Sequence, residues 1–510
     1  MIKIHRNYPK KNSLFVLTIF LLALTVFISF SPTLKNKFTS FDDDKYITQN
    51  PDIREFSWKQ AKTIFSSFHY GLYKPMVLFS YSIEYHFFKL NPIPYHCTNI
   101  LLHVLNTLGV FWFIYLISKK NFLVSLMTAL LFGIHPLHVE SVAWVTERKD
   151  VLYSLFYLSG LIGYVYFLRA QKAILRAFVL VCFILSLLSK PMAITLPFIL
   201  LLLDVWQGRK FDKNRILEKS LFFILGACFG LMNVSLSYLS GKIHPFNLIE
   251  SIQAVSYAPL FYIYKIFLPT DLSCVYPYPE RMGFWGRFFF YYAPFILAPL
   301  LILIFRLCRR YQFFLFGILF FSISILPVVQ IASFGVSVVA DHYVYLASIG
   351  IFYIFSETFY RLIDKKRPFF RRIVCLGMVP IFPLLLALTW NQCKVWRDSG
   401  SLWDHTIKNY PMIPLAYYNR GLERFKEKRF DEALEDLLKA KALDPGDPEI
   451  YFFLGNIYFK LKNYGDAIMH YHKAIDLQPT NRNACYNLAQ CYFTAGLESA
   501  GAFYLKRSVQ

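Results

Sequence analysis

Long uncharged apolar runs occupy most of this sequence and constrain its fold more than any other feature. The first extends from Leu14 to Phe30 without a charged residue, and similar runs recur up to about Trp390. Each is close to the roughly 20 residues that a helix needs to cross a bilayer. Composition agrees, because 56% of the 510 residues are hydrophobic and only 17% are charged, against about 25% in soluble domains. The sequence therefore predicts an integral protein of the lipid bilayer.

The net charge of +22 comes mostly from short Lys and Arg clusters between these runs. Such clusters mark cytoplasmic loops rather than a nucleic-acid surface, so we expect no nucleic-acid partner. They fit a cytoplasmic N-terminus and about eleven spans if 254–268 does not cross, with a long outer loop at 32–94 that carries interfacial helices. The predicted spans are 14–31, 95–117, 121–136, 151–168, 176–189, 191–206, 219–239, 286–305, 311–330, 343–363 and 371–390.

A 34-residue period begins after the last apolar run. Pro411, Pro445 and Pro479 are each 34 positions apart, and so are Gly421, Gly455 and Ala489. This is the period of tetratricopeptide repeats (TPRs), in which small residues allow paired helices to cross closely. The sequence thus predicts an all-α chain, with a membrane domain at 1–390 and a TPR domain of a half repeat plus about three repeats at 391–510. We expect protein partners to bind the TPR domain.

Five polar clusters lie at the predicted outer ends of the spans, where ionisable groups are costly and usually functional. They are Phe41-Asp42-Asp43-Asp44-Lys45-Tyr46, the stretch 73–88 with Glu84 and His86, His135-Pro136-Leu137-His138-Val139-Glu140, Glu147-Arg148-Lys149-Asp150 with Lys190-Pro191 nearby, and Asp341-His342-Tyr343. A solvated loop or a snorkelling belt is the alternative for each cluster by itself. Five clusters on one leaflet favour a functional site.

His135, His138 and Glu140 are the one motif here with the spacing of metal ligands, since His residues three or four positions apart share a helix face. Pro136 breaks that helix, and no fourth ligand is evident. We therefore interpret these residues as a hydrogen-bonded helix terminus or an acceptor-binding polar cluster. The nine Cys are scattered without a CxxC pair, which excludes a zinc site or disulfide framework of the usual kind. We expect no metal and no other cofactor.

The order of several segments resembles a known group of proteins. These segments are FDDDKYITQNPDI, LNPIPYHCTNILLH, HPLHVESVAWVTERKDVLYS, SKPMAITLPFILLLLDVW, ADHYVYLASIG and WRDSGSLW. Over nearly the whole chain they are similar to bacterial TPR-bearing membrane proteins related to the transmembrane-and-TPR protein O-mannosyltransferases, which are C-type (GT-C) glycosyltransferases. The resemblance implies a GT-C-like fold and catalysis by Asp42 and Asp43. Lys74 and His342 depart from it, since relatives usually have His and often Arg there. The sequence does not separate a bacterial cytoplasmic membrane from an endoplasmic reticulum, but the short TPR array favours the bacterial membrane.

A glycosyl donor outside the cytoplasm must arrive on a membrane lipid, because nucleotide sugars are normally absent there. We expect inverting transfer from a polyprenyl-phosphate sugar, with mannose the candidate, to a hydroxyl of a protein Ser/Thr or a glycan. Asp42 or Asp43 would take the acceptor's proton, and Glu84 is a further candidate carboxylate. The predicted ligands of the lipid phosphate, chosen because cations stabilise a departing phosphate, are Arg148, Lys149, Lys190 and His342.

Two other classes of function remain open. A non-catalytic membrane anchor that displays TPRs for assembly would explain the repeats, but it gives the polar clusters no role. A transporter or flippase would favour charges at mid-membrane, and Glu357 is one of few such residues.

We expect the TPR domain to lie outside the cytoplasm, because an odd number of spans carries the chain there from a cytoplasmic N-terminus. A reporter that fluoresces only in the cytoplasm should be dark when it is fused to the C-terminus. The same reporter fused after Lys172, in a predicted cytoplasmic loop, should fluoresce. Fluorescence from a folded C-terminal fusion would mean that 254–268 also crosses the membrane.

Overall fold

The computed structural model describes residues 12–509 apart from 69–70, 211, 240–242, 245, 331–332, 336 and 365–367, so the first eleven residues and Gln510 of the predicted domains lie outside the described part. The chain packs as two compact units. The first contains Met1–Phe38, Asp42–Tyr276 and Trp285–Arg397, and the second contains Thr39–Phe41, Pro277–Phe284 and Asp398–Gln510. Regular structure in the described part is helical except for two antiparallel two-residue strands, β1 (Ile243–His244) and β2 (Ser333–Phe334). The prediction of an all-α chain is confirmed.

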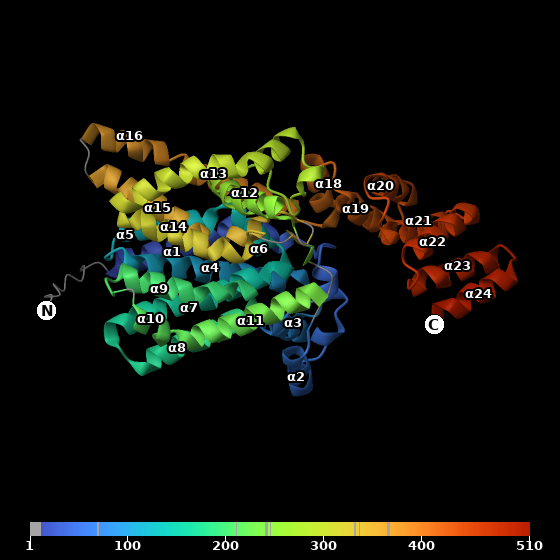
Figure 1. Cartoon of the computed structure of the whole chain (residues 1–510), viewed down its shortest axis with the longest axis horizontal. Helices are drawn as coiled ribbons and strands as arrows, with labels where there is room; N and C mark the ends of the chain where they lie inside the picture. The colour runs from blue at the N-terminus through green and yellow to red at the C-terminus, as the bar shows by residue number, and fades with distance from the viewer. Residues whose placement is uncertain are drawn as a thin grey trace. The chain divides into compact units, whose positions relative to one another are not determined.

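The α-helices of the first unit, called the membrane unit below and shown in Figure 1, are α1 (Asn12–Phe30), α2 (Trp58–Ser66), α3 (Pro75–Phe88), α4 (Pro92–Ile117), α5 (Phe122–Ile134), α6 (Val139–Ala143), α7 (Arg148–Ala170), α8 (Ala173–Ser189), α9 (Leu196–Trp206), α10 (Lys213–Glu218), α11 (Ser220–Leu239), α12 (Leu248–Phe267), α13 (Phe284–Arg310), α14 (Gln312–Ile325), α15 (Ser348–Asp364), α16 (Pro368–Met378) and α17 (Ile381–Val395). Short helices of other types join them: η1 (Ser31–Lys35), η2 (Asp44–Thr48), η3 (Pro51–Ile53), η4 (Pro136–His138), η5 (Val145–Glu147), η6 (Pro191–Thr195), η8 (Leu326–Val328) and η9 (Asp341–Val344). α4 packs against α5 and α7, and α7 packs against α8.

Fewer helices are long and apolar enough to cross a bilayer than the eleven predicted. In the described part of the chain these are the six segments Ser13–Lys35, Pro92–Ile117, Val145–Ala170, Ser220–Leu239, Phe284–Arg310 and Cys375–Val395, or seven if the bent pair Phe122–Ile134 and Pro136–Ala143 counts as one. The prediction of eleven is therefore corrected to six or seven.

Helix length is the physical reason for this difference. The other four predicted spans, at 176–189, 191–206, 311–330 and 343–363, are helices of at most 17 residues. Such a helix is about 25 Å long at about 1.5 Å per residue, which is short of a hydrocarbon core of about 30 Å. Proline sets some of these limits because it cannot continue a helix: Pro191 begins η6 directly after α8, and Pro327 follows the end of α14.

The predicted outer loop at 32–94 is a folded segment rather than an extended connection. Its helices α2 and α3 contribute Ile64, Val77 and Tyr81 to a buried cluster that also contains Tyr46. The Tyr81 hydroxyl donates a hydrogen bond of 2.8 Å to the carbonyl of Val145. The loop is thereby attached to the residues that directly precede α7.

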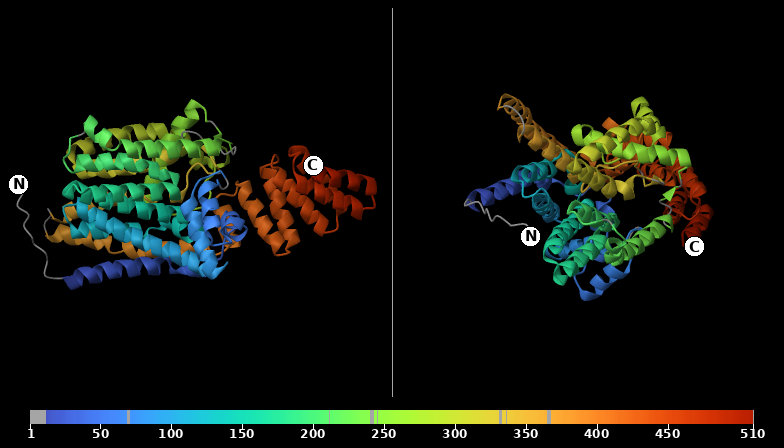
Figure 2. Two further views of the ribbon diagram at one scale, coloured as in Figure 1. Left: turned by 90° about the horizontal axis from the view of Figure 1, so that it is seen from below. Right: turned by 60° about the vertical axis from the view of Figure 1, so that its left-hand side comes forward.

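The second unit consists of α18 (Ser399–Asn409) and three helix pairs: α19 (Pro414–Lys426) with α20 (Phe430–Leu443), α21 (Pro448–Lys460) with α22 (Tyr464–Leu477), and α23 (Arg482–Thr494) with α24 (Glu498–Val509). Figure 2 shows these pairs stacked in chain order. The small residues of the 34-residue period lie where the helices cross. A Cβ added to Gly455 would lie 2.6 Å from ring atoms of Tyr471. The TPR repeats that the spacing predicts near the C-terminus are present.

Replacing Gly455 by Ala should destabilise the second unit, because the new methyl group overlaps the buried Tyr471 ring. Overpacking of this kind typically costs about 1–3 kcal/mol. Gly465 is the matched control, since the nearest atom to a Cβ there is 4.0 Å away, and Ala is the better helix former. Limited proteolysis during heating should cleave the Gly455→Ala protein at a lower temperature than the Gly465→Ala protein. Equal resistance would contradict the close crossing.

Candidate functional site

Four consecutive ionisable residues define the start of α7. η5 (Val145–Glu147) runs directly into this helix, which begins at Arg148. Glu147 and Asp150 are three positions apart and so lie on one face. Glu147, Arg148 and Asp150 are buried, each with 1% or less of its surface exposed. Because a buried charge without a partner is very costly, each needs a counter-ion.

The counter-ions come from different parts of the chain. Lys149 Nζ lies 2.5 Å from Glu147 Oε1. Lys190, the C-cap of α8, forms an ion pair with Asp150. Arg148 pairs with Glu84 of α3 at 2.5 Å. These pairs fix the start of α7 against two other helices.

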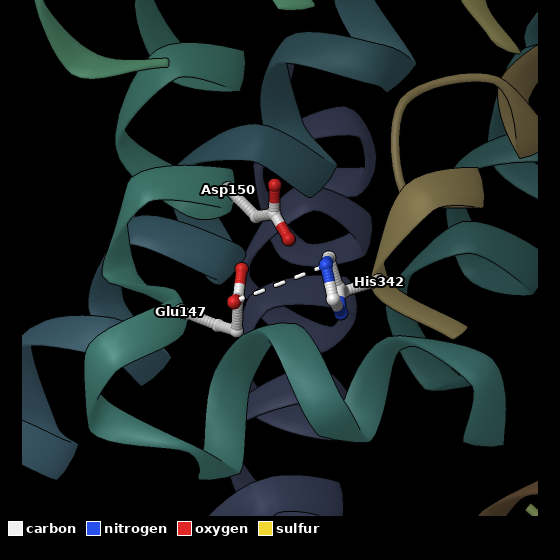
Figure 3. A group of neighbouring side chains, drawn as sticks. All are labelled: Glu147, Asp150 and His342. Carbon is white, nitrogen blue, oxygen red and sulfur yellow. Dashed lines mark ion pairs between the residues drawn. The ribbon is translucent and has the colours of Figure 1, made fainter. Parts of the chain in front are cut away.

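His342 joins this group from η9, far along the sequence. Glu140 Oε2 accepts a hydrogen bond of 2.9 Å from the backbone N–H of His342 and lies 3.1 Å from Nδ1 of its ring. The other ring nitrogen, Nε2, is 3.9 Å from Glu147 Oε1, and a dashed line joins these two side chains in Figure 3. Burial lowers the pKa of His342 to about 3, although the neighbouring Glu147 opposes that shift. The imidazole is therefore uncharged at neutral pH.

A cavity of about 850 Å³ opens beside this group. Its polar lining includes Lys74, Lys149, Lys190 and His342. The remaining wall is mainly apolar, and its residues from η6, α9, α11 and η8 include Pro191, Met192, Ile194, Pro197, Phe198, Phe223, Gly226, Ala227, Gly230, Leu231, Val234, Leu326, Pro327 and Val328. Small residues of α11 such as Gly226 and Gly230 leave room beside that helix. The cavity can hold a ligand with a long apolar part and an anionic group.

Three of the four residues predicted to bind lipid phosphate, Lys149, Lys190 and His342, line this cavity. Arg148 is not among its lining residues. The Arg148 guanidinium instead donates hydrogen bonds to the side chains of Glu84 (2.5 Å), Asn99 (2.8 Å) and Ser80 (3.2 Å) and to the carbonyl of Tyr95 (2.9 Å). The structure thus pairs Arg148 with Glu84, a predicted catalytic carboxylate.

Asp42 and Asp43 have different surroundings. Asp43 is 1% exposed, and its Oδ1 accepts hydrogen bonds from the backbone N–H (3.0 Å) and the hydroxyl (2.5 Å) of Thr146. Its side chain therefore lies beside the residue that precedes Glu147. The Asp42 side chain is 33% exposed and lies 3.3 Å from Lys45 Nζ. Asp43 is fixed next to the start of α7, whereas Asp42 is accessible.

His135 and His138 make internal hydrogen bonds. His135 Nε2 lies 2.9 Å from the carbonyl of Ile266. His138 bonds through Nδ1 to the carbonyl of Phe132 (2.7 Å) and through Nε2 to the hydroxyl of Ser348 (3.1 Å). Glu140 contacts His342 instead, so the structure does not gather the three residues around one point.

Sequence reasoning did not assign Lys74 or Asn233 to the site, although both line the cavity. Lys74 carries a signal, because it is an ionisable residue next to a proline in an otherwise apolar stretch. Its Nζ lies 3.4 Å from the centre of the Tyr46 ring. Asn233 is a single amide within the apolar run 219–239. A polar residue inside a spanning helix is the pattern that could have identified it.

Comparisons with known proteins find family matches to the repeats and relatives that are similar over most of the chain. The tetratricopeptide repeat family matches residues 448–481, and the TPR repeat family matches residues 421–462. Protein O-mannosyl-transferase F38B6.6 of Caenorhabditis elegans is 25% identical over 440 residues, which are 79% of this chain and 60% of that protein. Human protein O-mannosyl-transferase TMTC3 is 23% identical over 501 residues, 86% of this chain and 53% of that protein. Mouse protein O-mannosyl-transferase TMTC1 is 31% identical over 153 residues, 28% of this chain and 16% of that protein.

These homologues are protein O-mannosyltransferases by name. The apolar helices and these relatives together indicate a multi-pass membrane protein. The chain spans 53–60% of the length of the two relatives that it matches over most of its own length.

Replacing Arg148 by Met should strongly destabilise the protein, because Glu84 would remain buried without its counter-ion. Breaking one half of a buried pair typically costs about 3–5 kcal/mol. Arg361→Met is the control: Arg361 also pairs with a glutamate, Glu357, at 2.7 Å, but its side chain is 45% exposed. An exposed pair contributes about 1 kcal/mol or less. Thermal unfolding in detergent measures both. An Arg148→Met protein that unfolds normally but no longer binds polyprenyl phosphate would instead support the predicted phosphate role.

Proposed function

We propose that this protein is a C-type membrane glycosyltransferase that transfers a sugar from a polyprenyl-phosphate donor to an acceptor hydroxyl, with inversion at the anomeric carbon. The observation that carries the proposal is the mainly apolar cavity with Lys74, Lys149 and Lys190 in its lining. Its volume of about 850 Å³ falls within the range of about 300–1,000 Å³ usual for ligand sites. The names of the relatives support mannose as the sugar.

The donor would bind with its prenyl chain along α11 and its phosphate near Lys149 and Lys190. An apolar chain gains about 25 cal/mol for each Å² of surface removed from water. Ammonium groups make charge-assisted hydrogen bonds with phosphate oxygens, which are roughly twice as strong as neutral ones. One ligand class, a lipid-linked phosphate, satisfies both parts of the cavity.

The reaction needs a base for the acceptor and a stabilised leaving group. Asp42 or Asp43 would take the proton from the acceptor hydroxyl while the hydroxyl oxygen forms a bond to the anomeric carbon. The bond from that carbon to the phosphate oxygen breaks, and the phosphate leaves with the electron pair. Lys149 and Lys190 would stabilise the charge that develops there. General-base help is worth about 10²–10⁴-fold in rate.

We propose that the acceptor is a protein Ser or Thr side chain, and that the TPR repeats bind that protein or an associated one. We further propose that the chain resides in a bacterial cytoplasmic membrane with its TPR repeats outside the cytoplasm, which follows from a cytoplasmic N-terminus if the bent pair crosses and the spans number seven. A non-catalytic TPR assembly protein is the alternative. The repeats alone would suit it, but it gives no role to a cavity in which several cations lie beside an apolar wall.

The test is turnover of radiolabelled polyprenyl-phosphate mannose by the purified chain, with a Ser/Thr peptide as acceptor and release of polyprenyl phosphate as the readout. Asp42→Asn or Asp43→Asn should lower turnover by about 10²-fold or more while donor binding is largely retained, because an amide cannot take the proton. In the Asp43→Asn protein the amide keeps an oxygen that can accept the Thr146 bonds, so the protein should still fold. Asp44→Asn is the matched control and should have a mild effect.

Other outcomes separate the parts of this proposal. Near-normal turnover in both variants would exclude the two aspartates as the base. Absence of release from any polyprenyl-phosphate sugar, in a folded protein that still binds peptide, would favour the assembly role.

A further inference from the structure

We propose that Glu147, Asp150 and His342 bind a divalent cation beside the cavity. One carboxylate oxygen from each acid and one ring nitrogen of His342 all lie within 4.8 Å of one another. Figure 3 shows the three side chains directed toward a common point, two from the start of α7 and one from η9. Because metal–ligand bonds to such atoms are about 2.0–2.2 Å long, small side-chain movements suffice to place an ion between them.

An unsatisfied polar atom in this group is a second observation that points to an ion. Oε2 of Glu147 is buried and lacks a hydrogen bond, whereas Oε1 lies 2.5 Å from Lys149 Nζ. Glu147 is 1% exposed, so water does not solvate its carboxylate freely. Bound ions are among the few explanations for buried polar atoms of this kind.

The charges around this group favour a cation. Glu147 and Asp150 pair with Lys149 and Lys190, and Glu140 contacts His342. Counted in their charged forms beside a neutral imidazole, these five groups carry one excess negative charge. A divalent cation changes the excess to one positive charge, and the single negative charge of a phosphodiester then balances it.

This balance couples the cation to the lipid donor, a step that rests on the proposed function. Lys149 and Lys190 both line the cavity, and lysine side chains are long and flexible. As the cation takes over the carboxylates, the two ammonium groups can turn toward the donor phosphate. Each ligand then favours the other, and by linkage the two couplings are equal. The cation would also neutralise charge on the leaving phosphate as a Lewis acid.

From the sequence we expected no cofactor, because His135, His138 and Glu140, which are neighbours along the chain, were the one motif with the spacing of metal ligands. The ligands proposed here include His342, which only the fold brings beside Glu147 and Asp150.

Mn²⁺ is the probe for the test, because its free form has a strong electron paramagnetic resonance signal that is lost on binding. The full chain in detergent, stripped with chelator, should bind one equivalent. Glu147→Gln, Asp150→Asn and His342→Ala should each weaken binding by about tenfold or more. His342→Ala is the variant least harmful to folding, since that side chain is 12% exposed. Glu357→Gln is the matched control, a largely buried carboxylate paired with Arg361 on α15, and should bind normally.

A second titration includes polyprenyl monophosphate, which should raise the affinity for Mn²⁺. Stoichiometric binding that the three variants weaken supports the site even if the lipid has no effect, and that combination would count against the proposed donor instead. The site would be overturned if neither Mn²⁺ nor Zn²⁺ bound stoichiometrically. It would also be overturned if the three variants and the control bound Mn²⁺ equally.

Discussion

Pairing of buried charges at the start of α7 is the constraint on which the membrane unit depends. Removing an ion from water costs several kcal/mol even after the protein relaxes. Glu147, Arg148 and Asp150 are all buried, so the fold must bring a partner to each. Arg148 reaches Glu84 of α3, and Asp150 is reached by Lys190 at the end of α8. The packing of the neighbouring helices is therefore specified by electrostatics as well as by apolar contact.

A second set of buried charges acts toward the other end of the same helix. Asp204 of α9 pairs with Lys219, which directly precedes α11, and with Arg209 at 2.8 Å. The Tyr164 hydroxyl of α7 donates a hydrogen bond of 2.8 Å to Asp204. This network ties α7, α9 and α11 together, and α9 and α11 both contribute walls to the cavity. Charge pairs at the start of α7 and this network near the end of α7 thus fix the helices that line the cavity.

The cavity itself combines two environments that are difficult to join. Its apolar wall lowers the local dielectric constant, which strengthens any interaction between an ammonium group and an anion. The same low dielectric makes an unpaired charge costly. Lys149 and Lys190 meet both demands because carboxylates neutralise them in this structure. An anionic ligand must therefore compete with Glu147 and Asp150, and that competition favours ligands that bring a strong negative charge.

Helix positions could be read from the sequence, because long apolar runs in a bilayer can satisfy their backbone hydrogen bonds only as helices. The 34-residue period likewise determined the TPR repeats, since Gly421 and Gly455 recur where paired helices must cross closely. The sequence also placed Lys149 and Lys190 in one polar group, because both border apolar runs. It could not give the length of each helix after proline interruption, and so it overcounted the spans. Only the tertiary structure paired Arg148 with Glu84 and brought His342 to Glu147, because a buried ion takes whichever partner the packing brings within reach, however distant in sequence.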